Sequence, residues 1–196
     1  MLKADDLCAP MQFGEISLTP FNERDKDGLK AAANDAETWR WFTYRADDAY
    51  FDTLFWPNFV AHHKPPEECH FVVHFEGEIV GATCLLAVSE QHKRLEIGGT
   101  WYRGDQRGGV VNPVCKLLMI ERAFECGMQR VELKTDSENK RSRAAIEKLG
   151  ALYEGTLRRH MVLHDGTPRD TVYYSILVED WPPLRERLKA RIEALT

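Results

Sequence analysis

The sequence predicts one α/β (α+β) domain, in which seven strands and five helices follow one another along 196 residues. Three observations lead to this prediction. The length suits a single, sizeable core. Apolar residues recur with the period of a strand in some segments and of a helix in others. Glycine or proline stands where the period changes.

The composition limits the functions to consider. Hydrophobic residues make up 43% of the chain, as in ordinary globular proteins, and the net charge is −5. A negative net charge argues against a general nucleic-acid binder, because binding phosphates needs a clustered basic face. No apolar run approaches the length of a membrane span. We therefore expect neither nucleic acid nor a membrane as a partner.

Residues 1–12 are expected to form a loose arm before the first strand. They lack the apolar segment of a signal peptide. Reduced thiols in a cytoplasmic protein are the simplest interpretation of the cysteines, which are scattered and form no CxxC pair. These cysteines are Cys8, Cys69, Cys84, Cys115 and Cys126.

An aromatic-rich segment follows the first strand and the first helix. The alternating pattern predicts the strand over residues 15–19, and Asn22 is the predicted cap of a helix that runs to about residue 34. Most of the aromatic side chains that follow are expected to pack in the core. The alternative is that Trp41 or Tyr44 forms a wall of an acceptor pocket.

A hairpin is predicted from two strands, residues 70–75 and 79–88, joined by a turn that contains Gly77. The histidines between residues 62 and 70 do not have the spacing of a metal site, so no metal is expected. The central strand, residues 95–102, contains two adjacent glycines. Glycines inside a strand indicate a bulge or a close approach to the backbone.

A basic, glycine-rich loop over residues 103–109 connects the central strand to a helix. Asn112 is the predicted N-cap of that helix, and Pro113 suits its first turn. A strand, a basic glycine loop and a helix start together can bind an anion such as phosphate. The alternative is a plain glycine turn.

Five further elements complete the predicted succession. A helix that starts in residues 136–139 is expected to end at Gly150, which suits the left-handed position after a helix. The strands are predicted over residues 130–135, 152–163 and 171–178, and the last helix over residues 181–195.

Three separated motifs resemble the GNAT acetyltransferases. They are EIGGTWY at residues 96–102, RGDQRGGV at 103–110 and NKRSRAAIEKLGA at 139–151. The second is similar to the family's pyrophosphate loop, Q/R-x-x-G-x-G/A, with Arg103 or Gln106 opening the pattern, although Gly-Gly-Val replaces the commoner Gly-x-Gly. The third resembles the ribosomal-protein N-terminal acetyltransferase branch. The predicted order of elements also matches, from about residue 16 to residue 178.

The resemblance implies a mixed, mostly antiparallel seven-stranded sheet, splayed between its fourth and fifth strands and flanked by helices. The cofactor implied is acetyl-CoA, whose pantetheine arm would enter that gap. The residues implied to hold it are Thr100, Trp101, Tyr102, Arg103, Arg107, Gly108, Gly109, Val110, Asn139 and Ser142.

The implied chemistry is direct transfer of an acetyl group from the thioester to an amine. Glu96 is the candidate base, acting through water, and Ser142 is the candidate acid for the leaving thiolate. The alternatives are an ion-paired strand glutamate and a serine that only contacts the cofactor. Many relatives carry a tyrosine seven residues after the helix asparagine, where this chain has Ile146. The identity of the general acid is therefore left open.

The implied acceptor is a primary amine of a protein N-terminus or a small molecule, and Trp41, Tyr44 and Asp170 are the candidates for binding it. One alternative is a non-catalytic acyl-CoA-binding or regulatory module, which the missing tyrosine would favour. Another is a different donor such as succinyl-CoA, for which Arg141 or Arg159 would supply a cation. A homodimer is a further expectation.

Overall fold

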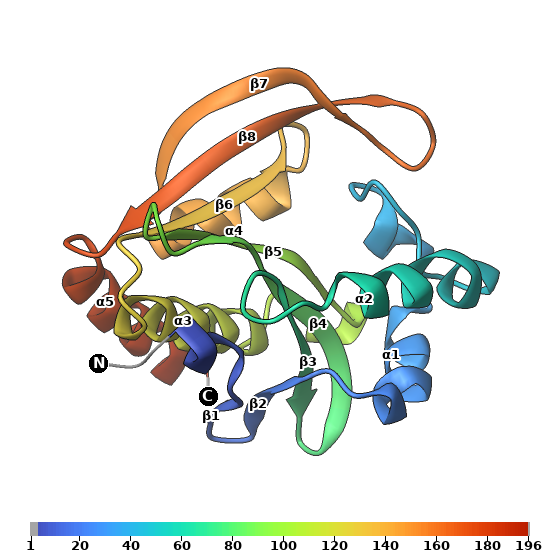
Figure 1. Cartoon of the computed structure of the whole chain (residues 1–196), viewed down its shortest axis with the longest axis horizontal. Helices are drawn as coiled ribbons and strands as arrows, with labels where there is room; N and C mark the ends of the chain where they lie inside the picture. Colours follow the sequence, from blue (N-terminus) through green and yellow to red (C-terminus); the bar gives the residue numbers. More distant parts are fainter. Residues whose placement is uncertain (1–3, 196) are drawn as a thin grey trace.

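The computed structural model describes residues 4–195 and contains one eight-stranded sheet with helices packed against it (Figure 1). The strands are β1 Met11–Phe13, β2 Ile16–Pro20, β3 Cys69–Phe75, β4 Glu78–Ser89, β5 Arg94–Tyr102, β6 Arg130–Asp136, β7 Leu152–Val162 and β8 Pro168–Leu177. The α-helices are α1 Lys26–Ala33, α2 Trp56–His62, α3 Val111–Glu125, α4 Lys140–Leu149 and α5 Trp181–Glu193. Shorter helical segments are η1 Ala4–Cys8, η2 Glu23–Asp25, η3 Ala36–Trp39, η4 Phe51–Phe55 and η5 Gly104–Gln106.

The strands lie in the order β1-β2-β3-β4-β5-β6-β8-β7, and only β5 and β6 run parallel. Their pairing covers Arg94 to Glu96 against Arg130 to Glu132 and then stops. The predicted mixed sheet and its splay are confirmed. The splayed pair is the fifth and sixth strands rather than the fourth and fifth, because the short strand β1 adds an eighth member to the sheet.

Each face of the sheet has its own hydrophobic core. Ile97 and Tyr102 of β5 pack in the core that contains α3, α4 and α5. Trp101, also on β5, packs in a second core with α1, η3, η4 and α2. Because neighbouring side chains of a strand point to opposite faces, β5 is held from both sides. Phe51, Phe55 and Phe59 are buried in this second core, as the helical spacing predicts.

Within residues 4–12, the N-terminal segment is not the loose arm expected from the sequence, and residues 1–3 of that arm lie outside the described residues. Leu7 of η1 is fully buried, and β1 begins at Met11. The Arg122 guanidinium of α3 donates hydrogen bonds to the carbonyl oxygens of Asp6 (2.6 Å) and Ala9 (3.4 Å). These contacts with the distant helix α3 give the segment a defined position. They could not be predicted from the residues of the segment alone. None of the helices in residues 4–195 is both long and apolar enough to span a membrane.

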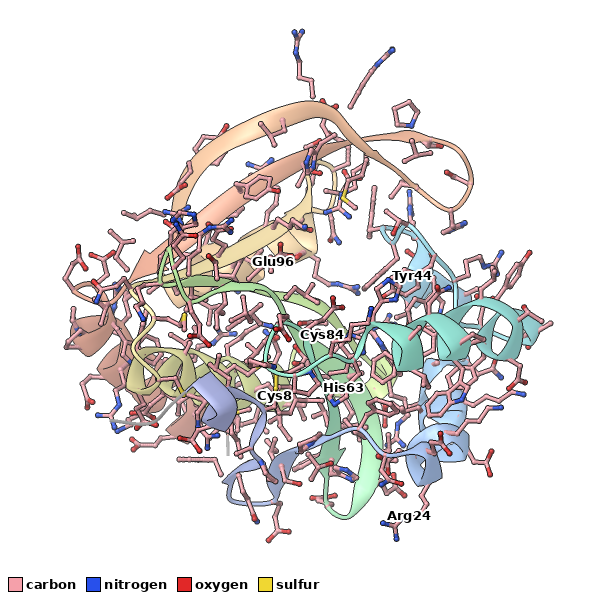
Figure 2. All side chains as sticks on the ribbon, in the orientation of Figure 1. Cys8, Arg24, Tyr44, His63, Cys84 and Glu96 are labelled. Atoms are coloured by element: carbon pink, nitrogen blue, oxygen red, sulfur yellow. A yellow bond between two sulfur atoms is a disulfide. The ribbon has the colours of Figure 1, made fainter. Side chains whose placement is uncertain are left out.

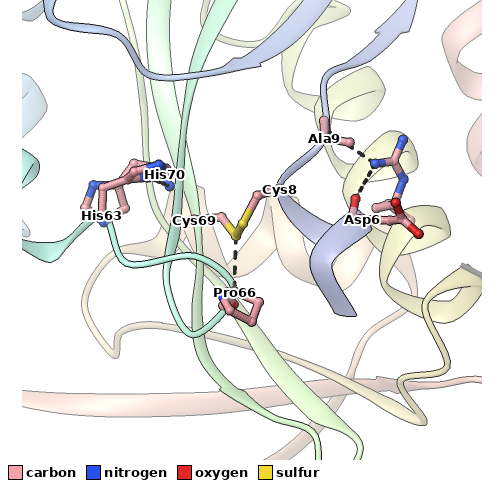
Figure 3. The surroundings of a disulfide bond; sticks show 8 residues. Asp6, Cys8, Ala9, His63, Pro66, Cys69 and His70 are labelled. Carbon is pink, nitrogen blue, oxygen red and sulfur yellow. Dashed lines mark hydrogen bonds between the residues drawn. A yellow bond between two sulfur atoms is a disulfide. The ribbon is translucent and has the colours of Figure 1, made fainter. Parts of the chain in front are cut away.

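The prediction of reduced thiols is wrong for two of the five cysteines. Cys8, at the end of η1, forms a disulfide with Cys69, the first residue of β3 (Figure 3). Their Cα atoms are 5.6 Å apart, although 61 positions separate them in sequence. Pairing across such a separation depends on the tertiary fold. The free cysteines, Cys84, Cys115 and Cys126, are buried.

Candidate active site

A cavity of about 560 Å³ opens where β5 and β6 part. Its walls come from β4, β5, β6, α3 and α4 and from the aromatic segment between η3 and α2. Figure 2 shows three lining residues, Tyr44, Cys84 and Glu96, below the β7–β8 hairpin. Of the residues predicted for the site, the lining contains Trp41, Tyr44, Glu96, Thr100, Trp101, Tyr102, Arg107, Gly108, Asn139 and Ser142. Outside the lining are Arg103, Gly109, Val110 and Asp170.

A bulge in β5 shapes one wall of the cavity. The register of β4 against β5 shifts at Thr83, so that Gly99 and Thr100 together lie opposite this single residue. Gly99 has a φ of +57°, which favours glycine, and a Cβ at this position would lie 3.1 Å from the sulfur of Cys84. The bulge predicted from the glycine pair is confirmed.

Glu96 is the last residue of β5 that pairs with β6, so its side chain lies where the strands part. It is 4% exposed, and its Oε2 lies 2.9 Å from Nζ of Lys134 on β6. The ion pair given as an alternative role is therefore present. The other oxygen, Oε1, is buried without a hydrogen-bond partner in the described chain. Leaving a buried carboxylate oxygen without a hydrogen bond lowers stability. Oε1 is therefore suited to accept a hydrogen bond from a water molecule or from an N–H of the amine substrate.

The two arginines predicted to hold pyrophosphate are engaged with carboxylates. Arg103 forms ion pairs with Asp105 (2.8 Å) and Glu78 (3.0 Å). Arg107 reaches out of the loop to Asp35, 2.7 Å away, just before η3. Arg107 therefore fastens the loop to the second core, and the positive charge of both arginines is largely balanced within the protein.

The backbone of the loop offers an anion site. The N–H groups of Gly108, Gly109 and Val110 donate no hydrogen bond to any part of residues 4–195. They lead directly into α3, whose first turn adds unpaired N–H groups and a partial positive charge. Gly108 has a φ of +82° and no atom within 4 Å of an added Cβ, which leaves room for an anion. Backbone amides are therefore the groups best placed to hold phosphate.

The start of α3 differs from the prediction. The helix begins at Val111 with Val110 as its N-cap, so Asn112 lies inside the first turn and is not the cap. Pro113 fits there because N–H groups of a first turn have no partner within the helix. The Asn112 side chain accepts a hydrogen bond from the Tyr102 hydroxyl at 3.4 Å. This bond connects the helix to the end of β5.

Lys116 is a lining residue that the sequence analysis missed. It lies one helical turn after Asn112, and both face the cavity. Lys116 is 5% exposed, and its Nζ donates to the Thr100 hydroxyl at 2.9 Å. No carboxylate of the described residues lies within ion-pair distance of it. Burial lowers the pKa of Lys116 to about 8. The available signal was the i, i+4 spacing of two polar residues in the first ten residues of α3, which are otherwise apolar.

The start of α4 brings Asn139 and Ser142 to the cavity. Asn139 is the N-cap of α4, and its Oδ1 accepts a hydrogen bond from the Ser142 N–H at 3.1 Å. Ile146 lies one turn further along the same cavity wall and is 6% exposed. A hydrocarbon side chain therefore occupies the position from which a tyrosine hydroxyl would donate.

Replacing Asn139 with alanine is expected to lower the free energy of unfolding by about 1 kcal/mol, because it removes the side-chain cap of α4. Urea unfolding of the two proteins measures this difference. Asn139→Asp retains an acceptor oxygen and should lose less. Equal losses in both variants would show that the cap is not the source of the effect.

Aromatic side chains from the segment between η3 and α2 form another wall of the cavity. Trp41 and Tyr44 line it, and the Tyr44 ring packs 5.8 Å from Trp39 and 5.9 Å from Phe55 between centroids. Burial raises the pKa of the Tyr44 hydroxyl. Asp170 is not brought to this wall, since its side chain accepts a hydrogen bond from the Arg159 N–H at 2.7 Å.

The residue before Asp170 lines the cavity instead. Side chains of neighbouring residues in a strand point to opposite faces of the sheet. A prediction that names Asp170 instead of Arg169 therefore selects the face that points away from the cavity. Arg169 of β8 is 9% exposed and belongs to the lining, and the sequence analysis did not single it out. Only the register of β8 against its neighbours decides which of the two faces inward.

Comparisons with known proteins agree with this architecture. Residues 15–152 match the family model described as "Acetyltransferase (GNAT) domain". The Bacillus subtilis (strain 168) protein named "Putative ribosomal N-acetyltransferase YdaF" is 30% identical over 108 residues, which are 55% of this chain and 58% of that protein. This chain thus aligns with little more than half the length of the curated relatives it matches.

Solved structures resemble the fold over most of the chain. A GCN5-related N-acetyltransferase from Brucella melitensis has a TM-score of 0.86 at 24% identity, covering 94% of this chain and 86% of that one. RimJ of Mycobacterium smegmatis, in complex with CoA-disulfide, has a TM-score of 0.78 at 24% identity, covering 90% and 88%. The family match over residues 15–152, the splayed sheet and the glycine loop before α3 together establish that the chain belongs to the GNAT acetyltransferase family.

Proposed function

We propose that this chain transfers an acetyl group from acetyl-CoA to a primary amine of a protein N-terminus or a small molecule. The observation that carries the proposal is the row of unpartnered backbone N–H groups from Gly108 to Val110, next to the cavity at the splay. A pyrophosphate held there would leave the pantetheine arm beside Thr100, Trp101 and Tyr102. These residues lie beyond the end of the pairing with β6, so this edge of β5 is free to pair with amides of the cofactor.

In the proposed reaction, the acceptor ammonium first loses a proton to Glu96, directly or through a water at its unpartnered Oε1. The amine nitrogen then attacks the thioester carbonyl, so a C–N bond forms, the C–S bond breaks and a thiolate leaves, and the proton that the new amide nitrogen gives up balances the proton that the thiolate takes up. A backbone N–H of the bulge is the candidate donor to the oxyanion, and Ser142 is the candidate donor to the thiolate. Alignment of the reactants can contribute up to roughly 7–11 kcal/mol.

Gly109→Glu is expected to weaken acetyl-CoA binding by roughly 10- to 100-fold, because it places a carboxylate beside the pyrophosphate amides. Gly109 has no positive φ, and the nearest atom to an added Cβ is 3.9 Å away, so the backbone tolerates the change. Calorimetric titration of acetyl-CoA into the folded proteins measures the effect. Gly109→Gln, of the same size without the charge, is the matched control and should bind nearly as well as the parent.

Other results would favour other functions. No binding to the folded parent would remove the cofactor, the mechanism and the enzyme assignment together. Binding without turnover of any amine would favour a non-catalytic acyl-CoA module, which Ile146 supports. Tighter binding of succinyl-CoA than of acetyl-CoA would favour a different donor. Arg141 lines the cavity and could meet a succinyl carboxylate, whereas Arg159 does not line it.

Three further predictions from the sequence accompany the proposal. A homodimer stays a prediction, as does the absence of a nucleic-acid partner. A cytoplasmic location also stays a prediction, and the Cys8–Cys69 disulfide weighs against it, because such bonds are typical of oxidising compartments.

A further inference from the structure

Arg169, like Lys116, is a buried cation of the cavity without a carboxylate partner in the described chain. Arg169 donates a hydrogen bond from Nη1 to the carbonyl oxygen of Trp41 at 3.2 Å. Its Nε is buried and has no hydrogen-bond partner. Across residues 4–195, no carboxylate lies within ion-pair distance of its guanidinium. Arg169 is thus a nine-tenths buried charge whose guanidinium, within residues 4–195, has a single hydrogen bond, and that bond is to a neutral group.

Such an arrangement is costly unless a ligand completes it. A guanidinium stays charged at any ordinary pH, and buried charges in proteins are normally paired. Burial lowers the pKa of Arg169, and the more distant charges of Asp136 and Glu96 oppose that shift. Arg169 is therefore a cation in the cavity that is suited to bind an anion, and that anion would have to come from a ligand.

The position of Arg169 connects it with the aromatic wall. β8 pairs with β6 no further than Thr171, and Arg169 lies two residues beyond that point. The same end of the β7–β8 hairpin contacts the aromatic segment a second time, where the His164 N–H donates to the carbonyl oxygen of Phe42 at 3.2 Å. The guanidinium is therefore held against the wall at Trp41, a residue that the sequence offers as a candidate for binding the acceptor.

We propose that Arg169 binds a carboxylate of the acceptor, which makes the acceptor an amine that carries a carboxylate close to its amino group. This inference rests on the proposed function. A planar guanidinium matches a carboxylate with two parallel hydrogen bonds, for which Nε is free. Glu96, a carboxylate of the cavity whose Oε1 is unpartnered in the described chain, would receive the ammonium end. The two opposite charges would orient the acceptor between them.

The two carboxylates whose charges act on Arg169 favour a carboxylate over a phosphate as its ligand. The fields of Asp136 and Glu96 already act on Arg169, so the second negative charge of a phosphate monoester would be repelled. Two sources of carboxylate fit this chemistry: a free amino acid with an apolar side chain, which suits the aromatic wall, and a protein N-terminus with an acidic residue close behind it.

Two matched pairs of probes distinguish these sources. L-Phenylalanine and L-phenylalaninamide differ only in the carboxylate, as do the tripeptide amides Ala-Glu-Ala and Ala-Gln-Ala. Binding of each probe to the CoA-loaded protein is measured by calorimetry, and acylation by release of the CoA thiol. The variants are Arg169→Met, which removes the charge, Arg169→Lys, which removes the planar fork, and Arg158→Met, an exposed control on β7.

In the parent protein, we expect the carboxylate member of at least one pair to bind roughly tenfold or more tightly than its neutral partner. This preference should be retained in Arg158→Met, reduced in Arg169→Lys and lost in Arg169→Met. The inference is overturned if neither pair shows the preference, or if the preference survives in Arg169→Met. It is also overturned if Arg169→Met selectively weakens binding of succinyl-CoA rather than of the amines. Failure of the parent to bind acetyl-CoA would instead refute the proposed function itself.

Discussion

Replacing Glu96 with glutamine is expected to lower kcat for amine acetylation by roughly 10²- to 10⁴-fold, the usual contribution of a positioned base. The two side chains have nearly the same shape, so the packing of Glu96 against Gly98, the residue before the bulge, is retained. The loss would come from the proton that an amide cannot accept. Steady-state kinetics with a saturating acyl donor measures it, once an acceptor amine has been found.

Glu132→Gln is the matched control for this experiment. Glu132 pairs with Glu96 in the β5–β6 register, but its carboxylate binds Arg94 and Arg130 and does not line the cavity. We expect its kcat to stay close to that of the parent. Equal rates in Glu96→Gln and the parent would refute the role of base and leave Glu96 as an ion-paired strand residue.

Replacing Lys116 with methionine is expected to raise the free energy of unfolding at pH 7 by up to about 3 kcal/mol. The folded-state pKa of Lys116 is about 8 against an ordinary value of 10.5, and a tenfold change in an ionisation constant corresponds to about 1.4 kcal/mol. The unfolded chain therefore binds more protons than the folded protein between these two pH values. In that window the parent gains stability as the pH rises, and below pH 8 it carries the full cost of the buried charge. Methionine fills similar space without that cost.

The pH dependence separates this effect from simple repacking. The advantage of Lys116→Met should fall to less than half by about pH 9.5 and vanish near pH 10.5, because the unfolded lysine then also loses its proton. Urea unfolding at pH 7 and at pH 9.5 gives the difference in free energy of unfolding between Lys116→Met and the parent. Ionisation of the cysteines does not affect this difference, because both proteins contain the same cysteines. Lys148→Met, on the exposed side of α4, should show no such trend. An advantage that does not change with pH, or a destabilised variant at pH 7, would contradict the prediction.

The part of the fold that short-range patterns encode could be predicted closely. β2, the β3–β4 hairpin and α4 lie within a few residues of their predicted positions, because alternation, helical period and terminal glycines are local properties. The left-handed Gly150 at the end of α4, with a φ of +89°, is one example. β1 and the disulfide at Cys8 were missed because contacts with distant segments determine them.

The candidate site divides in the same way. The sequence by itself determined the glycine loop before α3, the bulge at Gly99 and the hydrocarbon at Ile146, because each depends on the residue type at one position. Only the tertiary structure decided how the charged side chains are used. It directs Arg107 to a carboxylate outside the loop, buries Lys116 without a counter-charge and turns Arg169 rather than its neighbour into the cavity. The physical reason is that a long charged side chain finds its partner through strand register and helix packing, which bring together residues far apart in the chain.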